Sequence, residues 1–270
     1  MIRFAPCKIN LGLHVVEKRP DGYHNLETCF YPVPWCDVVE VVPAAELTFS
    51  MSGREVPGPP DTNLCLRAYG LLQKEFSLPP VAIHLHKVVP TGAGLGGGSA
   101  DGAHTLRALN DVFDLQLSRE ALLPFAARLG SDCAFFLYDE PMLGTGRGEV
   151  LSPLPVSLKD YFLVLVKPEL HVSTAEAYAG IVPRQPAREL VAVLREPVTT
   201  WRNLLMNDFE HTVFQKFPEI AAIKSTLYQQ GAVYAAMSGS GAAVFGLFEA
   251  PVDVRHHFEN SVCWSATLAV

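Results

Sequence analysis

The chain has 270 residues, of which 49% are hydrophobic and 18% charged, and its formal net charge is −7. This composition excludes a disordered chain and allows one large domain or two modest ones, each with a proper core. The negative charge argues against a general nucleic-acid binder, which needs a basic face, but an anionic small molecule needs only local positive groups.

The sequence also argues against a membrane-spanning protein and an exported one. The longest apolar runs, such as YFLVLV, are too short to span a bilayer. The opening residues MIRF have no basic flank, long apolar stretch or cleavage site, so we expect a cytoplasmic protein that binds neither membrane nor nucleic acid. The six cysteines show no CxxC pair or zinc spacing, and no pattern defines an oligomeric state.

The first elements in chain order are extended. Residues 2–16 predict a strand with a break at Pro6, and the β-branched residues 37–43 predict another. The stretch TFSMSGREVPG predicts a hairpin that closes at Gly53. Residues 61–76 have apolar side chains at helical spacing and predict a helix capped by its first or second residue, Asp61 or Thr62.

The next predicted strand leads directly to a glycine-rich segment. Residues 81–90 alternate between apolar and polar side chains, which is typical of a half-buried strand. His84 and His86 share one face of it and raise the possibility of a metal site. A structural metal needs more ligands than two, and no third ligand is evident nearby in the sequence, so we predict no metal site.

The segment PTGAGLGGGSADGA, residues 90–103, contains six glycines and precedes a helical pattern. Glycine loses much backbone entropy on folding, so such a cluster needs a reason. A strand, a glycine-rich turn and a helix N-terminus together form an anion site, because backbone N–H groups and the helix dipole favour negative charge.

Three general patterns could explain these glycines: a dinucleotide-binding fingerprint, the phosphate loop GxxxxGK[ST], and a flexible turn. Gly92, Gly94 and Gly97 satisfy GxGxxG, the dinucleotide fingerprint, which on its own is weak and requires a parallel sheet. The pattern GxxxxGK[ST] fails, because Gly98 stands where its lysine must be. A plain flexible turn explains two or three glycines but hardly six.

The remaining elements complete an α+β fold class, with strands grouped rather than strictly alternating with helices. A helix capped by Ser99 follows the loop, and a second helix starts at Ser118 and ends at Gly130. Residues 138–158 are rich in Gly, Pro and Ser and are expected to link two halves. Beyond them the sequence predicts a strand at 161–167, helices at 174–181, 187–194 and 218–230, and a strand pair around 232–248.

Three glycine-containing motifs together resemble those of the GHMP kinases. The order Pro90-x-Gly92-x-Gly94-Leu95-Gly96-Gly97-Gly98-Ser99 resembles the phosphate loop of this family, KINLGL at 8–13 its N-terminal motif and MSGSGAAVFGLF at 237–248 its C-terminal glycine motif. The resemblance implies a two-domain architecture, with an N-terminal ATP-binding domain at 1–150 and a C-terminal substrate-side domain at 151–270. It also implies an active site in the cleft between the domains.

Three further segments are similar to one branch of the family. They are KRPDGYHNLET at 18–28, GSDCAFF at 130–136 and PELHVSTAEAY at 168–178. This branch uses ATP to phosphorylate the 2-hydroxyl of 4-diphosphocytidyl-2-C-methyl-D-erythritol in the non-mevalonate isoprenoid pathway. Two alternatives remain: a GHMP kinase for another small alcohol, of homoserine or mevalonate type, and a nicotinamide-dependent dehydrogenase that rests on GxGxxG alone.

The resemblance implies a role for individual residues. Asp132 would be the catalytic base beside Lys8, and a carboxylate among the apolar neighbours of GSDCAFF does need a partner. On the substrate side, Asn10 would orient the methylerythritol hydroxyls, Thr174 lies in a matching segment, and Tyr23, His24 and Tyr178 would hold the cytosine by stacking and an edge hydrogen bond. On the ATP side, with Mg²⁺ near Ser99, the implied residues are Asn63, Lys87, Pro90, Gly92, Gly94, Leu95, Gly96, Gly97, Gly98 and Ser99.

The chain departs from the family pattern at two places. The phosphate loop of the family often ends Ser-Ser-Asn-Ala-Ala, whereas here Ala100 lacks a hydroxyl and Asp101 adds a charge near the triphosphate. The usual Pro-Gly of the later segment is Pro168-Glu169, which affects the loop that carries Thr174. Neither departure involves Lys8 or Asp132.

Overall fold

The structure is a computed structural model that describes residues 1–269, and the chain forms two compact units. Unit 1 comprises residues 1–8, 33–91 and 96–139, and unit 2 comprises residues 9–32, 92–95 and 140–270. The units therefore interleave along the chain, whereas the predicted boundary at residue 150 is a single point. The division into family domains at 1–150 and 151–270 stays a prediction.

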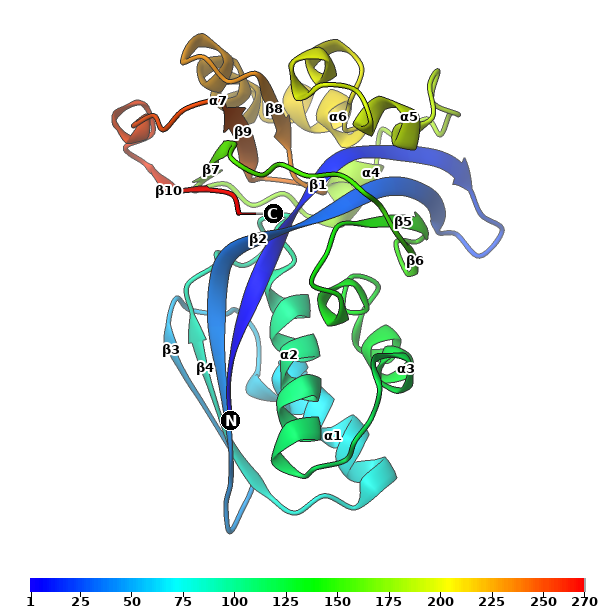
Figure 1. Cartoon of the computed structure of the whole chain (residues 1–270), viewed down its shortest axis with the longest axis vertical. Coiled ribbons are helices and arrows are strands. Elements are labelled where there is room, and N and C mark those ends of the chain that lie inside the picture. The colour runs from blue at the N-terminus through cyan, green and yellow to red at the C-terminus, as the bar shows by residue number, and fades with distance from the viewer. Residues whose placement is uncertain (270) are drawn as a thin grey trace. The chain divides into compact units, whose positions relative to one another are not determined.

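Unit 1 combines strands with three helices. β4 (Val81–Lys87) pairs antiparallel with the end of β2 (His24–Pro43) and parallel with β3 (Thr48–Gly53), while the start of β1 (Ile2–Lys18) lies beside β2. Successive side chains of a strand point to opposite faces, so β4 buries every second residue. The helices α1 (Leu64–Phe76), α2 (Gly97–Val112) and α3 (Arg119–Leu129) pack on one another (Figure 1), and 3₁₀ turns span Pro60–Thr62 and Phe135–Leu137.

Unit 2 contains a hairpin and a four-stranded antiparallel sheet. The start of β2 pairs with β5 (Met142–Gly146), which pairs with β6 (Val150–Pro153). The sheet has the order β10–β7–β9–β8, formed by β7 (Phe162–Pro168), β8 (Tyr234–Met237), β9 (Val244–Phe248) and β10 (Ser261–Thr267). The helices are α4 (Thr174–Tyr178), α5 (Leu190–Leu194), α6 (Phe209–Lys216) and α7 (Pro218–Gln229), with 3₁₀ turns at Val198–Asn203 and Arg255–His257.

The core of unit 2 explains why α7 forms where it does. Ile220, Ile223 and Leu227 are three or four residues apart, which places them on one helix face, and all three are buried. This face packs on β8 and β9 (Figure 1). The same cluster includes Val164 and Val166 of β7, so sheet and helices share one apolar interior.

Several sequence predictions of the fold are confirmed. The strand predicted at 81–90 is present at 81–87, and the helix that starts after Ser118 and stops at Gly130 and the strand pair around 232–248 are present as well. Ser118 caps α3 by accepting a hydrogen bond from the Ala121 N–H. The α+β class is confirmed as well.

Other predictions are wrong for identifiable reasons. β1 runs through Pro6 without a break, because proline is tolerated on an edge strand and the strand that pairs with β1 is β2. No hairpin closes at Gly53, since β3 pairs parallel with β4 instead. The cap of α1 is Asn63, whose side chain accepts from the Cys65 N–H, and α2 begins after Gly96 rather than at Ser99.

The segment 138–158 does not serve as a simple linker. Its residues form the β5–β6 hairpin, and Gly146 and Gly148 adopt φ values of +68° and +105° in the connecting turn. The same glycines that suggested a linker therefore allow the turn, because only glycine adopts such angles at little cost. α6 and β10 were not predicted at all.

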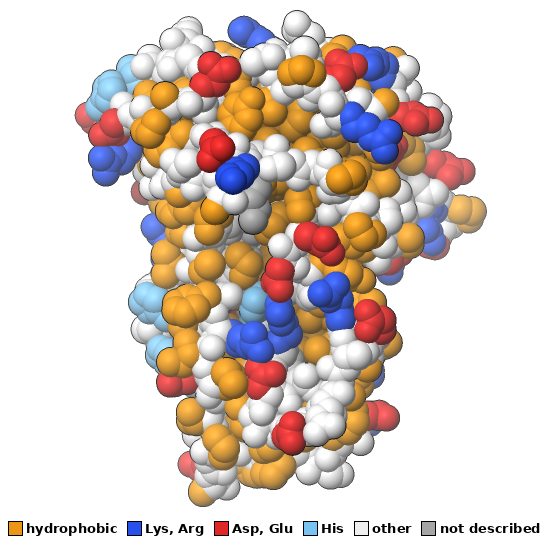
Figure 2. All heavy atoms as spheres, viewed as in Figure 1, with side chains coloured by type: hydrophobic (Ala, Val, Ile, Leu, Met, Phe, Trp, Pro, Cys, Tyr) orange, Lys and Arg blue, Asp and Glu red, His pale blue; other side chains and the backbone are white. Residues whose placement is uncertain are grey.

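The surface carries charges of both signs. Figure 2 shows one face, on which Lys and Arg side chains are interspersed with Asp and Glu among hydrophobic groups. Within residues 1–269, no helix combines the length and apolar character that crossing a membrane requires.

Candidate active site

Lys8 and Asp132 form a charged pair in unit 1. Lys8 lies on β1, Asp132 follows the end of α3, and Lys8 Nζ lies 3.8 Å from Asp132 Oδ2. The lysine side chain is only 4% exposed, whereas the aspartate is 35% exposed. One partner is thus fixed inside the unit, and the other can still reach a bound molecule.

The environment of Lys8 changes its acidity. Burial lowers the pKa of the Lys8 ammonium below its ordinary value, and the nearby Asp132 carboxylate partly opposes this change. A lysine in this setting loses its proton more readily than a solvated one. The pair therefore places a titratable cation next to a carboxylate that could accept a proton.

The glycine-rich loop has the backbone geometry of an anion site. Gly92, Gly94 and Gly96 have φ values of +61°, +76° and +70°, which only glycine adopts easily. No side chain of the described residues caps α2 after Gly96, so the N–H groups of its first turn stay available to an anion. A Cβ on Gly96 would lie 3.2 Å from Lys8 Cγ, which shows how closely the loop approaches the charged pair.

The other residues of the loop differ in how far they are buried. Pro90, Leu95 and Gly97 are buried, Ser99 is half-buried in the first turn of α2, and Gly98 is exposed. The loop therefore presents backbone, rather than large side chains, at the start of the helix.

A pocket of about 340 Å³ lies beside this helix start in unit 1. Apolar side chains from residues 51–64 line it together with the polar residues Asn63, Thr91, Lys87 and Asp101. Asn63 uses its carbonyl oxygen to cap α1, and its amide nitrogen donates to Met51 Sδ at 3.7 Å. The size and mixed lining suit a nucleoside.

Lys87 is not a free cation in this pocket. It is 1% exposed, and its Nζ donates to Asp37 Oδ2 and, at 2.7 Å, to Asp101 Oδ2. Its carboxylate partners raise the pKa of Lys87 against the lowering effect of burial, the largest influence. Burial raises the pKa of Asp101 to about 7, and Lys87 offsets only part of this rise. Lys87 thus lies where the resemblance implies, but it is already paired.

Sequence reasoning missed a second set of supporting contacts, in unit 2. The Ser238 hydroxyl donates to Gly94 O at 2.9 Å, and the Ala243 N–H donates to Ala93 O. Asn207 is 3% exposed and donates to the carbonyls of Met237 and Gly239, both at 2.8 Å. These bonds dock the 237–243 glycine segment on the loop residues 92–95. The only signal for Asn207 is an Asx residue just before a helical pattern.

The aromatic residues predicted to hold a base lie in unit 2, but not as an open sandwich. His24 stacks on Tyr178 with ring centroids 4.8 Å apart and planes 24° apart. The Tyr178 ring also meets Phe209 edge-on. Tyr23 is 56% exposed, and the Arg147 guanidinium lies 5.0 Å from its ring centroid. Burial, together with Lys18, lowers the pKa of His24, which favours the neutral imidazole.

Asn10 and Thr174 occupy very different settings in unit 2. Asn10 is 1% exposed and its amide donates to Thr28 Oγ1, which in turn donates to Gly12 O. Thr174 is exposed at the start of α4, after Ser173, which forms a capping box with Glu176. Asn10 is therefore a buried positioning group here, and Thr174 is free to meet solvent.

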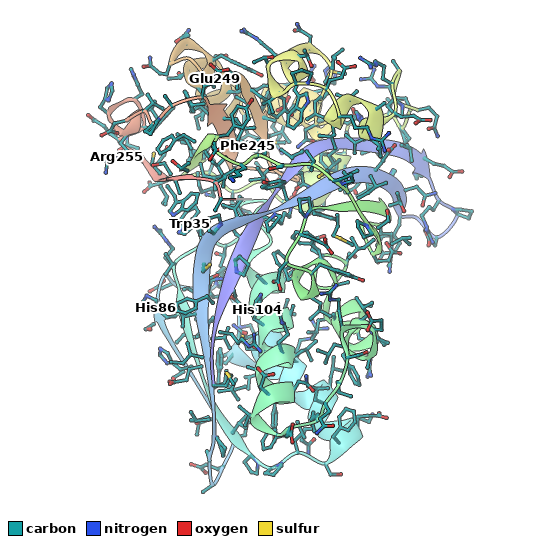
Figure 3. All side chains as sticks on the ribbon, in the orientation of Figure 1. Trp35, His86, His104, Phe245, Glu249 and Arg255 are labelled. Atoms are coloured by element: carbon teal, nitrogen blue, oxygen red, sulfur yellow. The ribbon has the colours of Figure 1, made fainter. Side chains whose placement is uncertain are left out.

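His84 and His86, considered above as metal ligands, contact serine hydroxyls instead. His84 Nδ1 lies 2.8 Å from Ser50 Oγ, and His86 Nδ1 lies 2.9 Å from Ser52 Oγ. Figure 3 shows His86 on the side of β4 that faces away from α2. Neither histidine is among the residues that line the pocket.

Family models match two parts of the sequence. Residues 63–140 match the GHMP kinases N terminal domain, and residues 190–260 match the GHMP kinases C terminal model. The first match contains the glycine loop, and the second contains the 237–243 segment. This chain also has a fold like that of a mevalonate kinase crystal structure, at a TM-score of 0.74 and 14% identity.

Curated relatives and a solved structure are similar over nearly the whole chain. A 4-diphosphocytidyl-2-C-methyl-D-erythritol kinase of Bacteroides fragilis is 50% identical, with 99% of this chain and 100% of the relative covered. The kinase of the same name from Chlorobium luteolum is 41% identical, with 95% and 91% covered. A crystal structure of 4-(cytidine 5'-diphospho)-2C-methyl-D-erythritol kinase has a TM-score of 0.84 and 34% identity, with 98% of both chains covered.

Proposed function

Because the chain belongs to the GHMP kinase family, we propose that it phosphorylates the 2-hydroxyl of 4-diphosphocytidyl-2-C-methyl-D-erythritol with ATP. The pairing of Lys8 with Asp132 supports the reaction type, since phosphoryl transfer to an alcohol needs a group that accepts its proton. Relatives of this name, at 41–50% identity over almost the full length, support the substrate.

The reaction assigns one task to each charged partner. The 2-hydroxyl oxygen forms a bond to the γ-phosphorus of ATP, the bond from that phosphorus to the β,γ-bridging oxygen breaks, and ADP leaves. Asp132 takes the hydroxyl proton, and the Lys8 ammonium polarises the hydroxyl. The N–H groups that open α2 hold the phosphates, and the 340 Å³ pocket receives the adenosine.

Mg²⁺ fits this scheme as a companion of ATP. Among residues 1–269, no group of three His, Cys, Asp or Glu side chains is placed to hold a metal by itself. Mg²⁺ at kinase sites keeps several waters and binds mainly through substrate phosphates, with the Ser99 hydroxyl as one protein donor nearby. When bound, it neutralises charge that develops on the phosphates.

Residues of unit 2 bind the cytidine part of the substrate. The exposed face of Tyr23 offers a stacking surface for the base, and the neutral His24 can exchange an edge hydrogen bond with it. Stacking on Tyr178 as well requires His24 to leave the Tyr178 ring, because the two rings are in contact.

The test is an ADP-release assay across candidate alcohols. We expect turnover with 4-diphosphocytidyl-2-C-methyl-D-erythritol and none with homoserine, mevalonate or galactose. Turnover with one of those alcohols instead would move the chain to another branch of the family. The nicotinamide alternative is excluded, because both glycine motifs fall within GHMP kinase models.

A further inference from the structure

Asn207 is a buried amide of unit 2 that belongs to none of the motifs of the chain. It lies just before α6 and is 3% exposed. Its amide nitrogen donates to Met237 O and to Gly239 O, both at 2.8 Å. Its carbonyl oxygen accepts from the Phe209 N–H at 3.0 Å. The two N–H donors of the side chain are therefore used on the glycine segment 237–243, and the acceptor is used on the start of α6.

The backbone that carries Asn207 is itself anchored on β1. The Leu13 N–H donates to Met206 O at 2.9 Å, and the Asp208 N–H donates to Leu13 O at 2.8 Å. Asp208 Oδ2 also accepts from the Val15 N–H at 2.8 Å. Both neighbours of Asn207 in the chain are thus fixed to a strand of the same unit. The amide therefore reaches the glycine segment from a rigid base, which a positioning group needs.

The two carbonyls that Asn207 binds lie on either side of Ser238, the residue that contacts the glycine-rich loop. Ser238 is fully buried, and its hydroxyl donates to Gly94 O at 2.9 Å. A Cβ on Gly94 would lie 2.0 Å from Ser238 O, so the two backbones leave no room for a side chain between them. Gly94 has a φ of +76°, and α2 begins only three residues later, at Gly97. A rotation of the peptides beside Ser238 would therefore disturb the start of α2 through a very short stretch of chain.

We propose that Asn207 is a positioning residue for ATP. By fixing the carbonyls of Met237 and Gly239, it holds Ser238 against Gly94 and keeps the glycine-rich loop in the conformation that binds phosphates. The proposal rests on the proposed function, in which the N–H groups that open α2 hold the phosphates of ATP. Without the amide, two buried carbonyls lose a donor, and the segment around Ser238 relaxes to recover one.

Two variants separate this task from the support of α6. In Asn207→Ser the hydroxyl can still accept from the Phe209 N–H, because Ser and Asn form the same kind of local turn with the residue two positions on. Its single donor on a shorter side chain cannot serve both carbonyls. Asn207→Asp keeps the shape and the acceptor, but an oxygen that only accepts replaces the NH₂ group and repels both carbonyls.

The experiment measures the Kd for ATP by calorimetric titration, and the KM values for ATP and for 4-diphosphocytidyl-2-C-methyl-D-erythritol by ADP release. In both Asn207 variants, the Kd and KM for ATP should rise about 10-fold or more, the scale of one buried hydrogen bond left unmade. The KM for the alcohol should change little. The matched control is Ser118→Ala, which removes the cap of α3. It should lower the melting temperature and leave both KM values at their wild-type level.

Ser238→Ala tests the route by which Asn207 acts. This substitution removes the donor to Gly94 O and should itself raise the KM for ATP. Combined with Asn207→Ser it should add little, because the two side chains act in series on the same loop. Effects that multiply independently would show that Asn207 does not act through Ser238, and they would overturn the proposal.

The outcomes separate this proposal from the proposed function. If the wild-type protein does not bind ATP, the proposed function fails and this proposal fails with it. If it binds ATP without phosphorylating the cytidine substrate, the proposed substrate is wrong, and the Kd for ATP still decides the role of Asn207. If folded Asn207→Ser binds ATP as tightly as the wild type, only the role of Asn207 is overturned. Circular dichroism confirms folding, and where Asn207→Ser fails to fold, the Kd of Asn207→Asp decides.

Discussion

At the scale of single residues, Asp132 carries the most direct prediction. Asp132→Asn keeps the size of the side chain but removes its ability to take a proton. We expect kcat to fall by about 100-fold or more while the KM values of both substrates change little. Steady-state ADP release gives both quantities. Asp139→Asn, which affects an exposed pair with Arg107, is the matched control. Near-normal turnover of Asp132→Asn would remove this carboxylate from the mechanism.

Lys8 should give the reaction a distinctive alkaline limit. Its pKa lies below the ordinary lysine value of 10.5, because burial disfavours the charged form more than Asp132 favours it. A reaction that needs the Lys8 ammonium should therefore lose rate as the pH rises, and this loss should occur at a pH lower than 10.5. The measurement is kcat/KM against pH. Lys8→Arg keeps its charge throughout this range, so any activity that this variant retains should not decline at high pH in this way. The same decline in both proteins would show that another group causes it.

His24 and Tyr23 should affect substrate choice in different ways. Tyr23→Ala should cost about 1–3 kcal/mol of substrate binding, the value of one lost stack, for the cytidine substrate and its uridine analogue alike. Tyr23→Phe keeps the ring and should be mild. His24→Ala should narrow the ratio of kcat/KM between the two substrates, because an edge hydrogen bond is lost. An unchanged ratio in His24→Ala would make this histidine structural and leave base reading to other groups.

The sequence could identify motif residues but not the residues that support them. Lys8 and Asp132 lie in recognisable segments and are indeed paired. Asp37 and Asn207 belong to no such segment, and only the folded chain brings them to Lys87 and to the carbonyls of 237–239. The contact between His24 and Tyr178 was also out of reach, since it joins two residues that lie far apart in the sequence.

At the scale of elements, a substitution that adds one methyl group can test the docking of loop 92–95 on the 237–243 segment. A Cβ on Gly94 would lie 2.0 Å from the carbonyl oxygen of Ser238, so Gly94→Ala must separate the two segments. We expect KM for ATP to rise at least 10-fold. Gly231→Ala is the control, because Gly231 has a similar positive φ of +95° and its Cβ would meet nothing within 4 Å. It should lose about 1–2 kcal/mol of stability from the left-handed backbone and keep its KM.

Titration with ATP and thermal unfolding of both glycine variants separate the two effects. Equal KM values would show that the docked arrangement of the segments does not matter for the nucleotide. A large loss of stability in Gly231→Ala would show that the backbone angle, rather than the collision, dominates at both positions.

The elements that sequence patterns predicted are those with strong local signals. α3 has a serine cap and a terminal glycine, and β4 has strict alternation. The β5–β6 hairpin was mistaken for a linker, because Gly and Pro mark turns and linkers equally. β3 was assigned a hairpin partner, since local sequence does not reveal that a strand pairs parallel with a distant one.

At the scale of the whole molecule, the interleaved units could not be derived from the order of motifs. β1 and β2 each contribute residues to both units, and the short stretch 92–95 belongs to unit 2 although both flanks belong to unit 1. Composition shifts mark boundaries only where a chain leaves one unit for good. Here it leaves and returns, so no single point along the chain separates the two contact units.

This interleaving has a consequence for the protein as it leaves the ribosome. Residues 26–30 of β2 emerge early, but their partners in β5 are residues 142–146. At about 5–20 residues per second, the nascent strand waits on the order of ten seconds for its neighbour. Phe30, which is 3% exposed in the finished protein, is unprotected during that time. Slower translation between the two strands should therefore prolong the exposure of an unpaired apolar edge and increase the demand for chaperone holdases.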